Sequence, residues 1–277
     1  EAPLSFVVFG ESSVGKSSFT DMIAAYMLRT NNIPCDDSMT YCVNSSDKYD
    51  SGYHSGIVHV KFDDYNNTNH NFVETSPAYD LIRFVNNVQQ TATMADLESK
   101  GKIVIKPKLV SVTTNTPTLG ADLYSNEPGS IVRRPNFYIN LTVKEEFRKP
   151  GTHMLSTEKV KEAYPDAQGC VMDIWEVDLY EAKLDRPPVL EHVNELKRRK
   201  PVCHVFKYIN HNGREMKKQS MRAVLECVKD LSRQHYNQQG YLLSAMKEPV
   251  KKMRICSVCD MPAGICTCEY PTFCSQL

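Results

Sequence analysis

The segment from Leu4 to Lys16 constrains the fold of this chain more than any other. The apolar run Leu4-Ser-Phe-Val-Val-Phe9 has the length of a buried strand, and Gly10-Glu-Ser-Ser-Val-Gly15-Lys16-Ser17 follows it directly. The glycines permit a tight loop whose backbone N–H groups point inward at phosphate oxygens. A helix predicted from about Lys16 to Arg29 adds its positive N-terminal end. This strand, loop and helix form a P-loop pattern and predict a phosphate-binding site.

The P-loop pattern assigns a role to individual residues. Lys16 can reach the β- and γ-phosphates of a nucleotide, and the Ser17 hydroxyl can bind Mg²⁺. The full set expected to contact the nucleotide is Gly10, Ser13, Val14, Gly15, Lys16, Ser17 and Ser18. A glycine turn with an incidental lysine is the alternative, and the strand before and the helix after the loop disfavour it.

Two acidic residues close a second apolar segment. Asp63 and Asp64 follow the predicted strand from Ile57 to Phe62, where a Walker B motif places its carboxylates. One acid of such a pair holds Mg²⁺ and the other can polarise the attacking water. We assign Asp63 to the metal and Asp64 to the water. A solvated acidic turn is the rival interpretation, and it is weaker after a well-formed P-loop.

Strands and helices alternate along the first half of the chain, which predicts an α/β fold with a mainly parallel central sheet. A Pro-Gly boundary lies between Phe147 and His153, and an α+β region is expected after it. The remaining expected elements are strands at Met39–Val43, Leu109–Thr113, Phe137–Val143 and Val171–Leu179, helices at Pro77–Gln90 and Lys217–Tyr236, a turn at Arg186–Pro188 and a hairpin around His211-Asn-Gly213.

The charge balance limits how the chain can contact nucleic acid. Its 33 lysine and arginine residues equal its 33 aspartate and glutamate residues, so any such contact needs a local basic patch or a channel built by assembly. No apolar run approaches the roughly 18 residues of a membrane span. The start, Glu1-Ala2-Pro3, has neither a signal peptide nor an initiator methionine. We expect a soluble piece of a longer protein.

Half of the ten cysteines lie in the last segment of the chain. Cys256, Cys259, Cys266 and Cys268 form the pattern C-x2-C-x6-C-x-C, and four thiolates can complete a tetrahedral zinc site. A short cysteine-rich segment cannot build its own apolar core, so a structural zinc ion would supply its folding energy. Cys274 could replace one of the four ligands. Free or disulfide-bonded cysteines are the alternative.

Four further motifs carry a family resemblance. They are Asp50-Ser-Gly-Tyr53, Met94-Ala-Asp-Leu-Glu-Ser-Lys-Gly101, Thr113-Thr114-Asn115 and Arg133-Arg134-Pro-Asn-Phe137. Together with the P-loop and Asp63-Asp64, their order and spacing resemble the superfamily 3 helicases of picorna-like positive-strand RNA viruses, the 2C proteins. The resemblance covers roughly residues 3–142, and the terminal cysteines show a weaker similarity to the same family. The segment after Asp64 departs from the usual continuation, and residues 151–253 form a long stretch for this group.

The resemblance implies an AAA+-like fold and assembly into a ring, usually a hexamer, with ATP between subunits. Asn115 would lie beside the γ-phosphate as a sensor. Arg133 and Arg134 would reach the nucleotide of a neighbouring subunit as arginine fingers, whereas a surface ion pair is the alternative role. The lysines around the loop before Thr113-Thr114-Asn115 would face the ring channel and contact RNA, or belong to a solvated charged hairpin. They are Lys100, Lys102, Lys106 and Lys108.

The predicted function is a Mg²⁺-dependent ATPase and RNA helicase or RNA-remodelling motor in viral RNA replication. Its expected partners are copies of itself, single-stranded RNA bound without sequence preference, and other viral replication proteins. We expect it at membrane-associated replication complexes in the host cytoplasm, with membrane contact through regions outside this chain. The expected domains are an ATPase core (1–150), its extension (151–254) and a zinc-finger-like segment (255–277).

Three other functions are compatible with a P-loop: a GTPase, a kinase and a scaffold. A GTPase would need an N-K-x-D motif, which the sequence lacks. A kinase would need an arginine-rich lid, for which the sequence offers no clear candidate. The third alternative is a non-unwinding, ATP-dependent assembly scaffold or AAA+-like chaperone.

Overall fold

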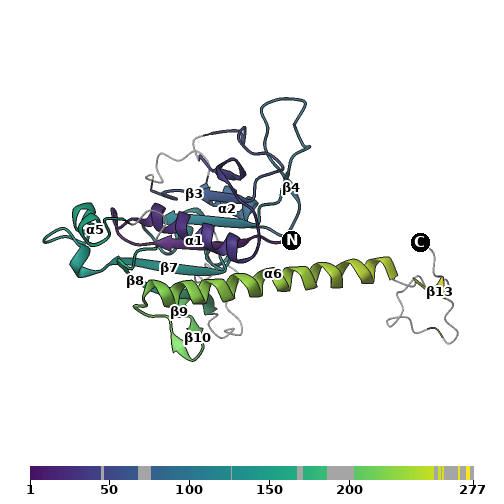
Figure 1. Ribbon diagram of the computed structural model, residues 1–277. Coiled ribbons are helices and arrows are strands. Elements are labelled where there is room, and N and C mark those ends of the chain that lie inside the picture. Colours follow the sequence, from purple (N-terminus) through teal and green to yellow (C-terminus); the bar gives the residue numbers. More distant parts are fainter. Residues whose placement is uncertain are drawn as a thin grey trace, which may run out of the picture. The chain divides into compact units, whose positions relative to one another are not determined.

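A seven-stranded sheet organises the larger part of the chain (Figure 1). The computed structural model describes residues 1–44, 47–67, 76–125, 127–166, 171–185, 203–252, 255–256, 258, 268 and 273–274. The strands lie in the order β2-β3-β6-β1-β7-β8-β9. Their bounds are β1 Leu4–Phe9, β2 Thr40–Cys42, β3 His59–Phe62, β6 Leu109–Thr114, β7 Phe137–Val143, β8 Trp175–Asp185 and β9 Cys203–Tyr208.

The sheet is parallel from β2 to β7 and antiparallel beyond it. Parallel neighbours need long crossover connections. The connection from β3 to β6 contains α2, whereas the described residues of the 43–58 connection from β2 to β3 contain no helix. The register pairs Phe6 with Phe137, so β1 and β7 begin at the same edge of the sheet. This arrangement confirms the mainly parallel α/β sheet predicted from the sequence.

Helices and short hairpins complete the described chain. The α-helices are α1 Lys16–Thr30, α2 Pro77–Phe84, α3 Ala121–Tyr124, α4 Gly129–Val132, α5 Thr157–Ala163 and α6 Met221–Lys252, and the 3-10 turns are η1 Asp37–Met39 and η3 Glu145–Phe147. Three two-stranded pairs lie outside the main sheet: β4 Gln90–Thr91 with β5 Val104–Ile105, β10 Asn210–His211 with β11 Arg214–Glu215, and β12 Ile255–Cys256 with β13 Phe273–Cys274.

One apolar core lies between the parallel strands and the short helices α2, α3 and α4. It includes Val7 of β1, Val112 of β6, Leu81 of α2 and Ile131 of α4. Helix α1 is not part of this cluster and packs against β1 and β6, so it covers the other face. Because both faces are covered, the parallel strands are apolar on both sides, and this explains the continuous run in β1.

The contacts divide the chain into two units. One comprises residues 2–233 and contains the whole seven-stranded sheet, and the other comprises Glu1 with residues 234–277. The sheet crosses residue 150, because β8 and β9 extend it. The domain boundaries at 150 and 254 stay a prediction. None of the helices in the described ranges has the length and apolar composition needed to cross a membrane.

Several predicted boundaries were wrong, and each has a local cause. Helix α2 ends at Phe84 rather than Gln90, because the Asn86 side chain accepts the N–H of Val88 and offers the backbone a turn instead. Strand β8 begins at Trp175 rather than Val171, because its partner β7 ends at Val143, opposite Trp175.

At the far end of the chain, α6 begins at Met221 rather than Lys217. Lys218 has a φ of 48°, which no helix accommodates. The same helix continues to Lys252, well past the predicted end at Tyr236.

The predicted hairpin at residues 210–215 is confirmed. Asn212 and Gly213 join β10 and β11 with φ angles of 52° and 78°, as a type I′ turn requires. Strand β9, in contrast, was not predicted. The turn predicted at residues 186–188 lies outside the described residues.

A buried ion pair anchors the β4–β5 hairpin. Arg83 of α2 pairs with Asp50, and both side chains are less than a tenth exposed. The same Asp50 carboxylate accepts the N–H of Thr93 at 2.8 Å, and the Tyr53 hydroxyl accepts the N–H of Lys106 at 3.1 Å. The Asp50–Tyr53 motif therefore holds both arms of the hairpin. Breaking such a pair costs about 3–5 kcal/mol, because the remaining charge stays buried.

Candidate nucleotide site

Three neighbouring strands bring the predicted site residues to one edge of the sheet. Strands β3, β6 and β1 lie side by side and run in the same direction. Their carboxyl ends carry Asp63, Asn115 and Gly10, respectively. The carboxyl edge of a parallel sheet is where ligands bind in open α/β folds. Residues that are about 50 positions apart in sequence are thereby placed within hydrogen-bond reach.

Two glycines give the loop its tight path. Gly10 has a φ of 153°, and a Cβ atom there would lie 2.6 Å from the Leu141 carbonyl oxygen. Gly15, which precedes α1, has a φ of 89°, and a Cβ atom would lie 3.3 Å from the indole of Trp175. Larger side chains would strain the backbone at both positions. The loop therefore passes close to β7 and β8.

The Lys16 ammonium lies at the centre of the site. Its Nζ donates to the carbonyl oxygens of Gly10 at 3.1 Å and Glu11 at 2.7 Å, and to the Asn115 side-chain oxygen at 2.8 Å. Burial lowers the pKa of Lys16, and the nearby carboxylates of Asp64 and Asp63 oppose that shift. A buried ammonium held between the loop and Asn115 is well placed to contact phosphate oxygens.

Asp63 is fixed by two hydroxyl groups. Its Oδ1 accepts hydrogen bonds from Ser17 at 3.0 Å and from Thr113 at 2.7 Å. Burial on its own would raise the pKa of Asp63, but these hydrogen bonds and the Lys61 ammonium outweigh it and lower the pKa. The carboxylate is thus ionised at neutral pH. The Asp63 carboxylate and the Ser17 hydroxyl together form a pair of oxygen ligands, which is the ligand type that Mg²⁺ prefers.

The backbone around Asp64 is held in an uncommon conformation. Asp64 has a φ of 49°, and its N–H donates to the Thr113 hydroxyl at 2.8 Å. Thr113 therefore holds both acids of the pair, a role that the sequence did not indicate although the residue lies within the motif that ends at Asn115. Its inward direction follows from the alternation of side chains along β6. Asn115 itself donates to the Asn67 side chain at 3.2 Å.

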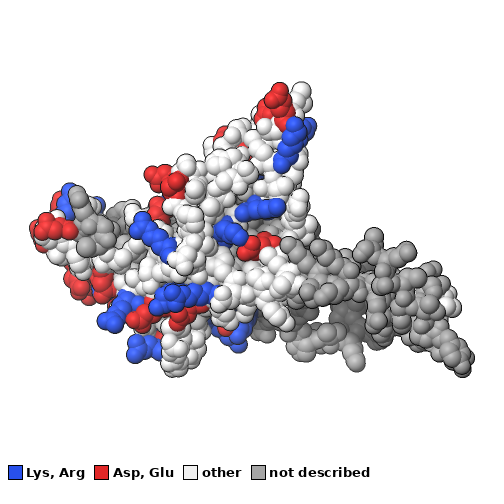
Figure 2. Space-filling model, turned by 45° about the vertical axis from the view of Figure 1, so that its right-hand side comes forward, with Lys and Arg blue, Asp and Glu red and all other residues white. Residues whose placement is uncertain are grey.

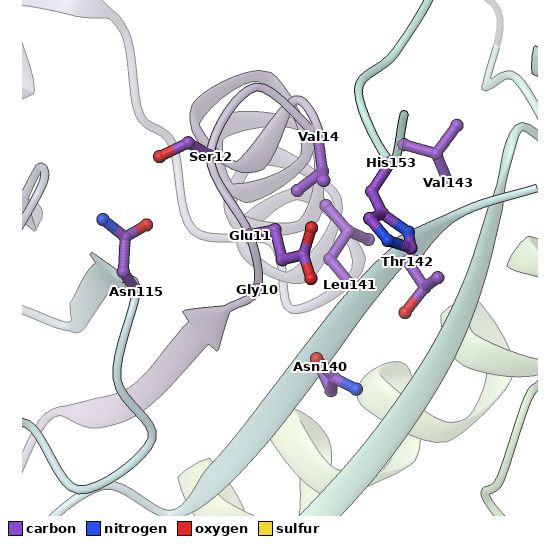
Figure 3. Close-up of a pocket in the computed structure, with 10 residues that line it drawn as sticks. All are labelled: Gly10, Glu11, Ser12, Val14, Asn115, Asn140, Leu141, Thr142, Val143 and His153. Carbon is purple, nitrogen blue, oxygen red and sulfur yellow. The ribbon is translucent and has the colours of Figure 1, made fainter. Parts of the chain in front are cut away.

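A hollow of about 660 Å³ adjoins the loop (Figure 3). Asn115 and His153 lie on opposite sides of it in this view, with Glu11 between them. The full lining is Gly10, Glu11, Ser12, Val14, Asn115, Asn140, Leu141, Thr142, Val143 and His153. Because the hollow is bounded by the loop on one side and by β7 on the other, it is suited to the polyphosphate end of a nucleotide or to the attacking water.

Two donors from the region after residue 150 also hold the loop. The indole Nε1 of Trp175 donates to the Val14 carbonyl oxygen at 2.8 Å. The backbone N–H of Leu155 donates to the Ser13 carbonyl oxygen at 3.0 Å. Trp175 is buried and lies 161 residues from Val14 in the sequence. The sequence carries no local signal for either contact, because neither donor belongs to a motif.

Arg133 and Arg134 lie at the opposite edge of the sheet from the P-loop. They precede the amino end of β7, which runs parallel to β1. The length of β1, roughly 20 Å at 3.3 Å per residue, separates the two edges. Arg133 is exposed, whereas Arg134 is half-buried and donates to the Val85 carbonyl oxygen at 3.2 Å. Burial, and secondarily the charge of Arg133, lowers the pKa of Arg134. Neither side chain can reach its own chain's Lys16.

The basic loop forms a charged hairpin. In Figure 1 the loop beside the β4 label extends away from the sheet. Lys100 and Lys102 are exposed on this loop, Lys106 is exposed directly after β5, and Lys108 is half-buried. Leu97, between two acidic residues of the same loop, is 86% exposed. Figure 2 shows acidic and basic side chains interspersed over this face, so the positive charge is local, as the balanced composition requires.

The cysteine segment is described only in part. The Cys256 and Cys268 sulfurs lie 3.9 Å apart, and Cys256 is buried. Cys259 and Cys266 lie outside the described residues. Within the described part of the chain, no three histidine, cysteine or acidic side chains form a metal-binding group.

The comparison with known protein families gives a match within the first half of the chain. A family model described as RNA helicase, the superfamily 3 helicase domain of picornavirus-like viruses, matches residues 6–116. This segment contains the P-loop, both acids and Asn115, and it ends before Arg133, Trp175 and the terminal cysteines. No curated protein matches the chain.

Proposed function

We propose that this chain hydrolyses ATP with Mg²⁺ and uses the energy to unwind or remodel RNA, because residues 6–116 match the RNA helicase family, of superfamily 3 type, which implies an NTP-hydrolysing enzyme. One observation carries the proposal. Asp63 and Asn115, which follow the ends of β3 and β6, converge on the P-loop and its Lys16, and the Lys16 Nζ lies 2.8 Å from the Asn115 side-chain oxygen. This is the arrangement that phosphoryl transfer needs, since catalysis there is mostly positioning and electrostatic stabilisation.

Each residue of the site has a separate task in this mechanism. Lys16 and the loop N–H groups hold the phosphates. The Asn115 side chain accepts a hydrogen bond from the Lys16 ammonium and so fixes its position. Ser17 and Asp63 would hold Mg²⁺, which when bound neutralises charge on the β- and γ-phosphates. Asp64 orients the attacking water. Water adds to the γ-phosphorus as the bond to the bridging oxygen breaks, which gives ADP and phosphate.

A complete site needs a second copy of the chain. The separation of Arg133 from the P-loop supports a role on a neighbouring nucleotide, because one chain cannot bring the two together. The exposed guanidinium of Arg133 suits such a role, whereas Arg134 is held by the Val85 carbonyl oxygen within its own chain. We therefore favour Arg133 as the arginine finger and a ring, hexameric as in the resembling family, as the active assembly.

The exposed lysines of the β4–β5 hairpin are the proposed RNA contact. A balanced net charge leaves this local patch to bind the phosphate backbone, without sequence preference. The proposed setting is viral RNA replication at host cytoplasmic membranes, with other viral replication proteins as partners and any membrane contact made by regions outside this chain. A non-unwinding, ATP-dependent scaffold or chaperone is the second candidate, because a ring could use ATP only to set its assembly.

RNA is expected to stimulate ATP turnover. We expect turnover per chain to rise with protein concentration and to rise further when single-stranded RNA of mixed sequence is added. Replacing Lys100, Lys102 and Lys106 with alanine should remove most of the RNA effect and weaken RNA binding. The difference from wild type should be largest at low salt, because the variant releases fewer counterions on binding. The matched control replaces three exposed lysines elsewhere, Lys149, Lys161 and Lys207. An ATP turnover rate that does not change when RNA is added would favour the non-unwinding scaffold.

The terminal segment is expected to bind one zinc ion per chain. Two thiolates at about 2.3 Å from a tetrahedral zinc lie about 3.8 Å apart, close to the 3.9 Å between the Cys256 and Cys268 sulfurs. Metal analysis of protein purified without chelator should find zinc, and Cys259→Ser or Cys266→Ser should lose it. Cys35→Ser, outside the segment, is the control. A folded, reduced sample without zinc would rule out the finger.

A further inference from the structure

The outer side of the P-loop is held by side chain and backbone donors from a distant part of the chain. Trp175 Nε1 donates to the Val14 carbonyl oxygen at 2.8 Å, and Leu155 N–H donates to the Ser13 carbonyl oxygen at 3.0 Å. Both donors lie outside residues 6–116, the segment matched to the helicase family. The contacts involve two consecutive peptide groups of the loop.

The geometry of the peptide bond turns these contacts into a directional constraint. In a planar trans peptide, the C=O of one residue and the N–H of the next point in opposite directions. When the Ser13 carbonyl is held pointing outward, the Val14 N–H therefore points inward. In the same way, holding the Val14 carbonyl outward directs the Gly15 N–H inward. Among the described residues, neither N–H has an acceptor in the protein. They are free to bind phosphate oxygens.

The loop has a conformation that needs such support. Ser13 has a φ of 63°, a left-handed conformation that costs free energy for a residue with a Cβ atom. The Trp175 ring is packed edge-on against Phe19 of α1, with centroids 5.3 Å apart, and is buried. Its Cζ2 atom also lies within 3.3 Å of the position that a Cβ on Gly15 would take. The indole is thus fixed between the loop and the helix that follows it.

We propose that Trp175, together with the backbone of Leu155, is a positioning residue that orients the Val14 and Gly15 N–H groups toward the β-phosphate. This role rests on the proposed nucleotide function. It also gives the region after residue 150 a task, because the phosphate site of the helicase segment is completed by β8 and the stretch before α5. The contact is made with loop backbone, so it favours ATP and ADP alike.

The test is nucleotide affinity in a variant that loses only the donor. Trp175→Phe keeps an aromatic ring at this position and removes the N–H. The Kd values for ATP and ADP, measured by calorimetry, should both rise about five- to tenfold, as expected for one neutral hydrogen bond. In turnover, KM should rise similarly with kcat within about twofold, because binding is lost equally in the ground and transition states.

A matched control separates positioning from general stability. Tyr138→Phe removes another buried aromatic donor, whose hydroxyl donates to the Val132 carbonyl oxygen at 2.6 Å, away from the P-loop. Both variants should lower the melting temperature, but only Trp175→Phe should weaken nucleotide binding. If Trp175→Phe does not fold, β-(3-benzothienyl)alanine at position 175 keeps the two-ring shape and deletes the same N–H.

The outcomes distinguish this inference from the proposed function. If wild-type protein binds ATP, Lys16→Ala does not, and the Trp175 variants bind as wild type does, the positioning role is wrong while the nucleotide site stands. If wild-type protein binds neither ATP nor ADP, both proposals fail. Equal weakening by Trp175→Phe and Tyr138→Phe would assign the effect to stability and also overturn the positioning role.

Discussion

Replacing Lys16 with alanine is expected to lower ATP turnover by about 100-fold or more, the loss typical when a preorganised donor to a developing charge is removed. The ammonium is the only group in the described site that contacts both the start of the loop and Asn115. Its loss removes the charge that faces the γ-phosphate. Phosphate release measured with saturating ATP and Mg²⁺ checks the expectation, with Lys161→Ala on α5 as a control for an exposed lysine.

A second variant locates the loss in the chemical step. Asp64→Asn keeps the size of the side chain and the N–H bonded to Thr113, but removes the carboxylate that would orient water. It should spare ATP binding more than turnover, whereas Lys16→Ala should weaken both. Hydrolysis by Lys16→Ala at the wild-type rate would contradict the site assignment.

Replacing Arg133 with alanine is expected to lower turnover by about 1,000-fold, as for arginine fingers that stabilise charge in phosphoryl transfer. ATP affinity should change much less than turnover, because the charge that an arginine finger stabilises develops mainly in the transition state. ATP turnover and ATP binding, measured on the same assembled sample, separate these two quantities.

Mixing two inactive variants gives the sharpest result. Lys16→Ala supplies an intact Arg133, and Arg133→Ala supplies an intact P-loop. In a randomly co-assembled ring, about one interface in four pairs the two intact parts, so an equal mixture should recover up to about a quarter of wild-type activity. The control is the double variant, Lys16→Ala with Arg133→Ala, mixed with either single variant, which contains no complete interface. No recovery, with co-assembly shown by cross-linking, would contradict a finger that acts on the neighbour.

The convergence of the candidate site residues could be predicted because each of them follows a local rule. The P-loop needs glycines at fixed spacing, and the acids and Asn115 end their strands, so the sequence placed them without knowledge of the strand order. The contacts that hold these groups could not be predicted. Thr113 lies within β6, and nothing in the sequence distinguishes it from the other strand residues. Trp175 reaches the loop only because β8 folds back antiparallel to β7.

The boundaries that were wrong depend on the same kind of non-local information. Strand β8 begins where its partner β7 ends, and this register is set by pairing rather than by residue pattern. The Asp50–Tyr53 motif is part of the family resemblance, yet its physical role depends on tertiary structure. It forms an ion pair with Arg83 and accepts hydrogen bonds from both arms of the hairpin.

The placement of the two halves of the proposed site on opposite edges of the sheet has a consequence for assembly. A contact that joins the P-loop edge of one chain to the Arg133 edge of the next is head-to-tail, so it uses two different surfaces. A dimer of this kind leaves one P-loop without an arginine and one arginine without a nucleotide. Growth by the same contact therefore stops only when the rotation per subunit closes a circle, and a small change of that angle would yield an open filament instead.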